Sequence, residues 1–136
     1  KKTALALIEK ARTVIESKEP PLRLTDNATD WRCRFCDYSG ICHENEVPEV
    51  NCRTCAHSTP VVTGTDGKWT CDKHGDLPSD TSFECPDHLF TPSIFSFASA
   101  VESDGSTWVK YIDDDFVEFT NGVGGKTSKE IYDGQM

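Results

Sequence analysis

The hydrophobic positions near the N-terminus recur at the spacing of a helix. Between Thr3 and Lys18 an apolar residue returns every three or four positions, and charged residues fill the positions between them. The apolar positions are Leu5, Leu7, Ile8, Ala11, Val14 and Ile15. Pro20-Pro21 follows, and a proline has no backbone N–H to donate to a further helical turn. The pattern predicts one amphipathic helix over Thr3–Lys18.

The C-terminal part of the chain carries a pattern typical of strands. Thr107–Asn121 is rich in β-branched and aromatic residues on both sides of Asp113-Asp114-Asp115, which favours a β-hairpin with its turn at the aspartates. The preceding stretch, Leu89–Ala100, is apolar and aromatic, so we expect it to pack over the central region. Ser128–Tyr132 is predicted to form one closing helical turn.

The centre of the chain, Trp31–Cys85, shows neither period and holds all seven cysteines. Glycine, proline, aspartate and serine interrupt it, which favours short strands and turns held together by metal ligands. We therefore predict an α+β fold, a small zinc-stapled chain with an N-terminal helix, a zinc-ribbon-like centre and a C-terminal β-hairpin. Its expected parts are residues 1–50 (helix and first cysteine motif), 51–97 (zinc-ribbon-like module) and 98–136 (acidic hairpin tail).

The low hydrophobic content of the chain favours a fold that is stabilised by bound metal. Only 36% of the 136 residues are hydrophobic, which leaves little material for a core. The formal net charge is -9, so the chain as a whole lacks the positive field that non-specific nucleic-acid binding requires. The sequence has no apolar run of about 18 residues and no secretory signal, so we expect no membrane contact and an intracellular protein with reduced thiols.

The cysteines are spaced as zinc ligands. Two Cys-x2-Cys pairs occur, Cys33/Cys36 and Cys52/Cys55, and a turn of this length brings two thiolates to one ion. Each zinc ion then needs two further ligands to complete a tetrahedron. The remaining candidates are three cysteines and four histidines, namely Cys42, Cys71, Cys85, His43, His57, His74 and His88.

The preferred partition between two zinc ions uses every cysteine. It assigns one ion to four thiolates and the other ion to three thiolates and a histidine. The two sets are Cys52, Cys55, Cys71 and Cys85, and Cys33, Cys36, Cys42 and His43. His57 is a spare candidate for the histidine position.

A rival partition has the spacing of a zinc ribbon. It joins the two Cys-x2-Cys pairs at one ion and leaves Cys42 as a free thiol. The second ion would be held by two Cys-x2-His pairs, Cys71 with His74 and Cys85 with His88. Spacing leaves both partitions open. In both, we expect the ions to be structural.

The first cysteine motif resembles part of a nuclease family. The stretch Trp31–Cys42 contains Cys-x2-Cys-x5-Cys and is similar to the C-terminal cysteine motif of RecB-like PD-(D/E)XK nucleases, which follows a helix and a proline-rich turn. Asn51–Pro60, Lys68–Cys71 and Cys85–Phe90 resemble the tail of phage-encoded members. The resemblance implies a non-catalytic C-terminal portion of a phage-type nuclease. The parent enzyme would be a Mg²⁺-dependent DNA nuclease.

The same resemblance offers an alternative metal for the first site. Some relatives bind an iron–sulfur cluster whose first cysteine lies far upstream of the other three. No cysteine precedes Cys33 in this sequence, so we favour zinc closed by a histidine and keep the iron–sulfur cluster as the alternative.

The catalytic motif of that family requires an acidic residue on one strand and Asp/Glu-x-Lys on the next, to hold Mg²⁺ and activate water. Pro48-Glu49 followed by Asp66-Gly67-Lys68 has these residue types, but it lies among the candidate zinc ligands. We therefore predict no catalytic residue in this chain.

One functional hypothesis follows from the resemblance. The chain would support a nuclease core or its contact with DNA, with Arg32, Arg34 and Arg53 as candidates for phosphate contact. Its partner would be the rest of a nuclease chain or a protein complex, in the cytoplasm of a phage host. DNA would be reached through the parent chain.

A second hypothesis follows from the acidic charge. A small acidic phage interaction protein can occupy a basic nucleic-acid-binding site on a host protein, such as a defence complex. The candidates for protein contact are then Asp113, Asp114 and Asp115 at the predicted hairpin turn.

Overall fold

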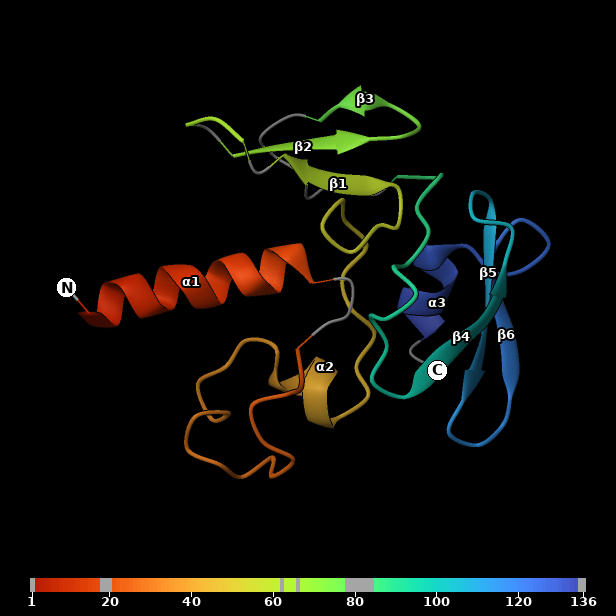
Figure 1. The fold of residues 1–136 in the computed structure, drawn as a ribbon. Helices are drawn as coiled ribbons and strands as arrows, with labels where there is room; N and C mark the ends of the chain where they lie inside the picture. Colours follow the sequence, from red (N-terminus) through yellow and green to blue (C-terminus); the bar gives the residue numbers. More distant parts are fainter. Residues whose placement is uncertain (1, 18–20, 62, 66, 78–84, 135–136) are drawn as a thin grey trace.

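The computed structural model describes residues 2–17, 21–61, 63–65, 67–77 and 85–134. Over these residues the predicted α+β fold is confirmed, with helices and two small antiparallel sheets following one another along the chain (Figure 1). The N-terminal helix projects from the rest of the molecule, whereas the C-terminal sheet and the last helix lie together (Figure 1).

The predicted N-terminal helix is present as α1, Lys2–Glu16. Every described side chain from Thr3 to Ser17 is exposed, including Leu7 and Ile8 at 62% and 59%. The expected helix end at Lys18 and the stop signal at Pro20 lie outside the described residues. The apolar face of α1 is thus uncovered by the described part of the chain.

The first cysteine motif folds as a series of turns that ends in the short helix α2, Ser39–His43. The Cys36 N–H donates to the Cys33 carbonyl at 3.1 Å, and the Cys42 N–H donates to the Tyr38 carbonyl at 3.0 Å. These turns reverse the chain, so that the last residue of α2 returns toward Cys33.

The ribbon-like centre contains the expected short strands. They are β1 (Ser58–Val61), β2 (Lys68–Cys71) and β3 (Gly75–Asp76), in the order β1-β2-β3 and all antiparallel. Ser58 pairs with Cys71, and Cys71 pairs with Gly75. Gly75 has a φ of 76°, a left-handed conformation that glycine adopts without a steric penalty, and this permits the tight turn between β2 and β3.

The predicted hairpin is present within a larger sheet. Strands β5 (Trp108–Asp113) and β6 (Glu118–Gly122) form the hairpin, and β4 (Ala98–Ser103) pairs with the other edge of β5. The sequence did not indicate β4, because its residues are mostly small and polar. The chain then forms α3, Ser128–Gly134, which is longer than the single turn expected.

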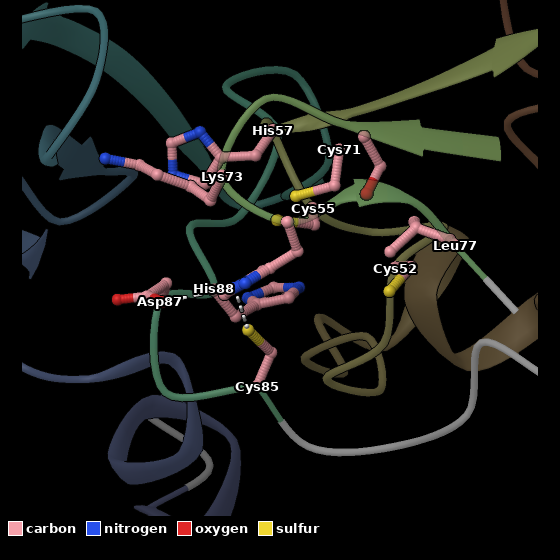
Figure 2. A pocket seen from close by; sticks show the side chains of 11 residues that line it. Cys52, Cys55, His57, Cys71, Lys73, Leu77, Cys85, Asp87 and His88 are labelled. Carbon is pink, nitrogen blue, oxygen red and sulfur yellow. Dashed lines mark hydrogen bonds and ion pairs between the residues drawn. The ribbon is translucent and has the colours of Figure 1, made fainter.

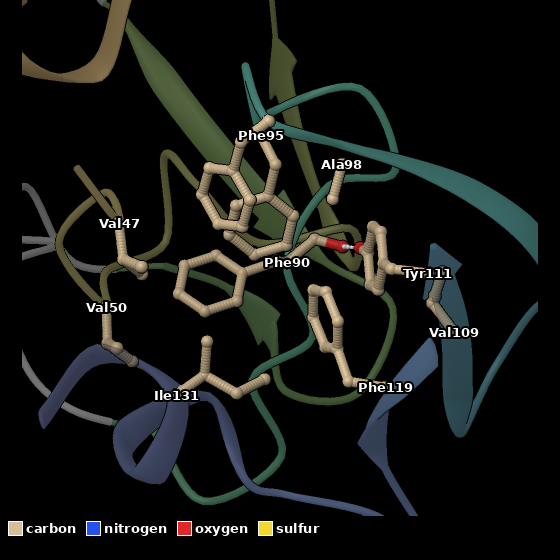
Figure 3. Close-up of a cluster of buried hydrophobic side chains, with 10 residues drawn as sticks. Val47, Val50, Phe90, Phe95, Ala98, Val109, Tyr111, Phe119 and Ile131 are labelled. Atoms are coloured by element: carbon tan, nitrogen blue, oxygen red, sulfur yellow. Dashed lines mark hydrogen bonds between the residues drawn. The ribbon is translucent and has the colours of Figure 1, made fainter. Parts of the chain in front are cut away.

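The hydrophobic core lies against the C-terminal sheet (Figure 3). The Phe95 ring contacts the rings of Phe90, Tyr111 and Phe119 at centroid distances of 5.0, 5.0 and 5.9 Å. The other buried members are Val47, Val50, Phe97, Ala98, Val109 and Ile131. This core is shared across the expected boundary between residues 97 and 98, so the aromatic stretch before β4 packs with the tail.

Candidate metal centre

Many of the candidate ligands converge on one small cavity, which we call the thiol cavity (Figure 2). Its volume is about 10 Å³, which is room for one water-sized species and too little for an organic ligand. Its lining residues are Cys52, Cys55, His57, Ser58, Cys71, Lys73, His74, Leu77, Cys85, Asp87 and His88. Four of the seven cysteines and three of the four histidines are among them.

A turn and a strand pairing place Cys55 and Cys71 at the same cavity. The Ser58 N–H donates to the Cys55 carbonyl at 3.2 Å, which closes the turn that begins at Cys55. The antiparallel register of β1 and β2 places Cys71 opposite Ser58 and therefore beside this turn. Cys52, Cys55 and Cys71 are all buried.

The segment over residues 85–91 carries Cys85, Asp87 and His88. It is hydrogen-bonded to the ribbon-like centre on one side and to α3 on the other. The His88 N–H donates to the Cys85 carbonyl at 3.1 Å, which forms a turn like the one between Cys33 and Cys36. On the ribbon side, the Ala56 N–H donates to the Leu89 carbonyl at 2.7 Å. On the sheet side, the Ser128 hydroxyl donates to the His88 carbonyl at 2.7 Å. His88 is thereby held at the cavity by backbone contacts from two directions.

The thiols of the cavity are in an environment that favours a bound cation. Burial raises the pKa of Cys52, and the neighbouring thiols of Cys55, Cys85 and Cys71 raise it further. Burial also raises the pKa of Cys55, although two backbone N–H groups oppose this rise. A divalent cation displaces the thiol protons and compensates the thiolate charges that burial would otherwise disfavour.

His88 is the most buried imidazole of the cavity, with 3% of its surface exposed. Its Nε2 atom lies 3.1 Å from the Asn51 carbonyl oxygen and 3.1 Å from Thr54 Oγ1. Its Nδ1 atom is buried and makes no hydrogen bond within the described residues. Burial lowers the pKa of His88 to about 4, so the ring is neutral near neutral pH. Among the residues that the structure describes, the other buried side-chain atom without a partner is the Oγ atom of Ser58, and Ser58 lines the same cavity.

A second group of ligand atoms lies where the cavity meets solvent. His74 Nε2 is 3.5 Å from Cys85 Sγ and 3.1 Å from Asp87 Oδ2. Ligand atoms of these three residues lie within 4.8 Å of one another, and among the residues that the structure describes they form the one such group. Sequence reasoning missed Asp87. The signal was its position between Cys85 and His88, because carboxylate oxygen is also a zinc ligand.

In the first cysteine motif, one histidine approaches one thiol. His43 Nε2 lies 3.6 Å from Cys33 Sγ. Cys33 is buried, Cys42 is partly exposed and Cys36 is exposed. Of the described residues, none from this motif lines the thiol cavity, so the two Cys-x2-Cys pairs do not share it as the rival partition would require. All seven cysteines are free thiols in the structure.

The candidate phosphate contacts differ in how free their side chains are. Arg32 is engaged with Asp30, since its Nε and Nη2 atoms donate to the two carboxylate oxygens at 2.9 and 2.8 Å. This pair lowers the pKa of Asp30 to about 2. Arg34 and Arg53 are exposed, and their guanidinium groups have no partner among the described residues.

The candidate protein contacts at the hairpin turn also differ in role. Asp113 Oδ1 accepts the N–H groups of Asp115 and Val117 at 3.0 and 2.8 Å, so this carboxylate holds the turn itself. The Asp114 N–H donates to the Phe97 carbonyl at 3.0 Å. Asp114 and Asp115 have exposed side chains.

The residue types that match a nuclease motif are scattered over the ribbon-like centre. Lys68 is exposed at the start of β2, and Glu49 is exposed in the loop before Cys52. Asp66 lies outside the described residues.

Comparison of the chain with protein-family models, with curated proteins and with solved structures finds no match. None of the described helices combines the length and the apolar character that crossing a bilayer requires.

Proposed function

We propose that the chain is a zinc-folded, non-catalytic module that serves as the C-terminal portion of a phage-type PD-(D/E)XK nuclease and supports its core or its contacts. The observation that carries the metal-binding part of this proposal is the convergence of thiols and imidazoles on one ion-sized cavity. The nuclease part comes from the resemblance of the cysteine motifs and is supported by the exposed apolar surface described below.

Zinc suits the donor set of the thiol cavity. Thiolate and imidazole ligands favour zinc over the hard cations Mg²⁺ and Ca²⁺, which take oxygen ligands. The buried Nδ1 atom of His88 and the buried thiols of Cys52, Cys55 and Cys71 have the chemistry of a closed structural site. Bound zinc would link the turn at Cys55, the β1-β2-β3 sheet and the segment around His88, which leads into the core.

Zinc also suits the first cysteine motif. Ligands about 2.0–2.3 Å from a tetrahedral ion lie about 3.3–3.8 Å from one another. The 3.6 Å between Cys33 Sγ and His43 Nε2 falls in this range. A histidine at this position favours zinc with Cys33, Cys36, Cys42 and His43 over a cluster that requires a fourth cysteine.

The N-terminal side of the molecule has the character of a docking surface. Large apolar side chains are exposed on α1 and on the first cysteine motif, which is unusual for a surface that contacts only water. Among them are Leu5, Leu7, Ile8, Trp31, Phe35 and Tyr38, with exposed fractions of 67, 62, 59, 76, 85 and 66%. A catalytic core packed against residues 1–50 would cover this surface, and Arg34 beside Phe35 would lie at its border.

Substitution of one buried ligand tests the metal-binding part. We expect Cys52→Ser to lower the zinc content and to unfold the ribbon-like centre, because ligand loss removes several kcal/mol of folding free energy. Zinc content per chain and the dispersion of amide NMR signals from residues 51–77 measure the two effects. Thr59→Ala, on the exposed face of β1, is the matched control and should retain both. A folded, fully zinc-loaded Cys52→Ser protein would refute the assignment.

A further inference from the structure

We propose that His88, rather than Cys85, completes the buried metal site, and that Cys85 forms a second, surface metal site with His74 and Asp87. This inference rests on the proposed zinc binding at the thiol cavity and changes the expected partition of its ligands. The surface site would take zinc or a similar borderline divalent cation.

Burial divides the ligands of the cavity into two groups. Five of them are less than one-tenth exposed, namely Cys52, Cys55, His57, Cys71 and His88 at 6, 8, 6, 9 and 3%. Figure 2 shows the His57 ring beside the cationic side chain of Lys73, so we leave this imidazole out of the buried group. Cys85 is partly exposed, and the side chains of His74 and Asp87 are 45% and 54% exposed. A structural zinc site is closed by four ligands and excludes water, and the three thiols with His88 have the number and the burial that such a site needs. Among the described residues, no three of these ligand atoms lie within 4.8 Å of one another, so a bound ion would draw them together.

The hydrogen bonds of His88 leave its Nδ1 atom free to bind a cation. The Asn51 carbonyl oxygen, 3.1 Å from Nε2, can only accept a hydrogen bond. The Thr54 hydroxyl has a single proton, and its closest acceptor is the Glu49 carbonyl at 2.6 Å. Nε2 therefore carries the proton of the neutral ring, and the lone pair lies on Nδ1. A metal-binding histidine commonly donates its other N–H to a backbone carbonyl in this way.

The surroundings of His88 fix this orientation. Its ring meets Phe90 edge to face at a centroid distance of 4.9 Å. Its carbonyl accepts the Ser128 hydroxyl, and the Phe90 N–H donates to Asn121 Oδ1 at 2.8 Å. Within the described residues, Nδ1 is consequently a buried acceptor without a donor at a cavity that thiols also line, and a metal ion would satisfy it.

If Cys85 is not a ligand of the buried ion, it is available to bind a second ion together with His74 and Asp87. The separations of 3.5 and 3.1 Å from His74 Nε2 to Cys85 Sγ and Asp87 Oδ2 are close to those of ligands that share an ion, about 3.3–3.8 Å. Figure 2 shows Cys85 on the opposite side of the cavity from Cys55 and Cys71. Three ligands leave the fourth position of a tetrahedral ion open, so water or a donor atom from a partner would complete this site.

A spectrum of the unmodified chain tests the role of His88 without any risk of unfolding. Long-range ¹H–¹⁵N correlation on the zinc-loaded protein distinguishes protonated, bare and metal-bound imidazole nitrogens. We expect His88 with a protonated Nε2 and a metal-bound Nδ1. A bare Nδ1 on His88 in protein that contains stoichiometric zinc would overturn the inference while leaving the proposed zinc binding intact.

Zinc counting in full-length variants tests the partition. We expect His88→Ala to lose one tightly bound zinc ion, whereas His57→Ala, which removes another buried imidazole of the same cavity, should keep it. We expect Cys85→Ser to keep all tightly bound zinc. The reverse result, with tight zinc lost in Cys85→Ser and kept in His88→Ala, would overturn the partition.

Titration with zinc against a chromophoric chelator tests the surface site. The wild-type chain should show one weaker site in addition to those that survive dialysis, and Cys85→Ser and Asp87→Ala should each lose it. Asp72→Ala, which removes a nearby exposed carboxylate, is the matched control and should retain it. A titration without a weaker site, or one unchanged in Cys85→Ser, would mean that His74 and Asp87 form an ion pair only and would overturn the second half of the inference.

Discussion

Asn121 joins the segment beside the candidate metal centre to the C-terminal sheet and α3. It is fully buried, and its Oδ1 atom accepts the Phe90 N–H at 2.8 Å. Its Nδ2 atom donates to the Lys126 carbonyl at 3.2 Å and to Ser128 Oγ at 3.0 Å. A buried side-chain amide with such partners holds the segment beside His88 in one position.

Replacement of this amide should weaken both the fold and the metal site. We expect Asn121→Ala to lower the free energy of unfolding by about 1–3 kcal/mol, because the Phe90 N–H is left buried without an acceptor. Urea denaturation of zinc-loaded protein measures the change, and Ser103→Ala on the exposed end of β4 is the control. Equal stabilities of the two variants would show that the Asn121 contacts contribute nothing.

At the residue scale, the sequence indicates which residues are candidate metal ligands, but it does not indicate which of them share an ion. The spacing of Cys52 and Cys55 was sufficient to identify a ligand pair. Asp87 was missed because a carboxylate in an acidic chain is a weak signal on its own. The free Nδ1 atom of His88 depends on contacts with Asn51 and Thr54, which are more than thirty positions away in sequence and visible only in the fold.

Among the elements, α3 shows how a short helix is held in place. The Thr127 N–H and hydroxyl both donate to Glu130 Oε2 at 2.8 Å, and the Glu130 N–H donates back to Thr127 Oγ1 at 3.2 Å. This reciprocal arrangement is a capping box. The helix in turn places Ile131 in the core and Ser128 against the His88 carbonyl.

The capping box gives the fold a dependence on pH. The Thr127 N–H and then its hydroxyl lower the pKa of Glu130 below its ordinary value of 4.5. A lowered pKa in the folded state stabilises the fold above the ordinary value and loses that contribution as the pH falls through the folded value. We expect Glu130→Gln to lose less stability than the wild type between about pH 5 and pH 3. Identical stability profiles by thermal unfolding would contradict this.

Helix α1 should be dispensable for the stability of the remainder. Ile8 and Ile15 are 59% and 57% exposed, and α1 contacts no other element of the described chain. We expect the double substitution Ile8→Ser and Ile15→Ser to change the unfolding free energy of the sheets by less than about 0.5 kcal/mol and to leave zinc content unaltered. Denaturant unfolding monitored at core amides measures this. A larger loss would mean that α1 packs on the module in solution.

At the element scale, the helices and strands with a strong pattern of hydrophobic or β-forming residues were the ones that could be predicted. The amphipathic spacing of α1 and the β-forming residues of β5 and β6 were sufficient to place those elements. Strand β4 was missed because Ala98–Ser103 is small and polar, and its pairing is imposed by β5 through the register of Ala98 with Asp113. Whether the apolar face of α1 is covered cannot be inferred from its own residues.

In the molecule as a whole, metal and the hydrophobic core would stabilise different parts of the chain. The hydrophobic core stabilises the C-terminal sheet and α3, whereas the described part of the cysteine-rich centre has short strands and few buried apolar side chains apart from its cysteines. Zinc at the thiol cavity would hold the centre against that core. The N-terminal side would remain available for a nuclease core, with the exposed guanidinium group of Arg34 on that side.

The metal content of the purified protein shows whether zinc folds this chain. Inductively coupled plasma mass spectrometry on protein purified without added metal, with a visible absorption spectrum alongside, should give about two tightly bound zinc ions per chain and no colour. Iron with a broad brown absorption would contradict the zinc assignment of the first cysteine motif in favour of an iron–sulfur cluster. A folded chain without stoichiometric metal would contradict the proposal that zinc folds the protein.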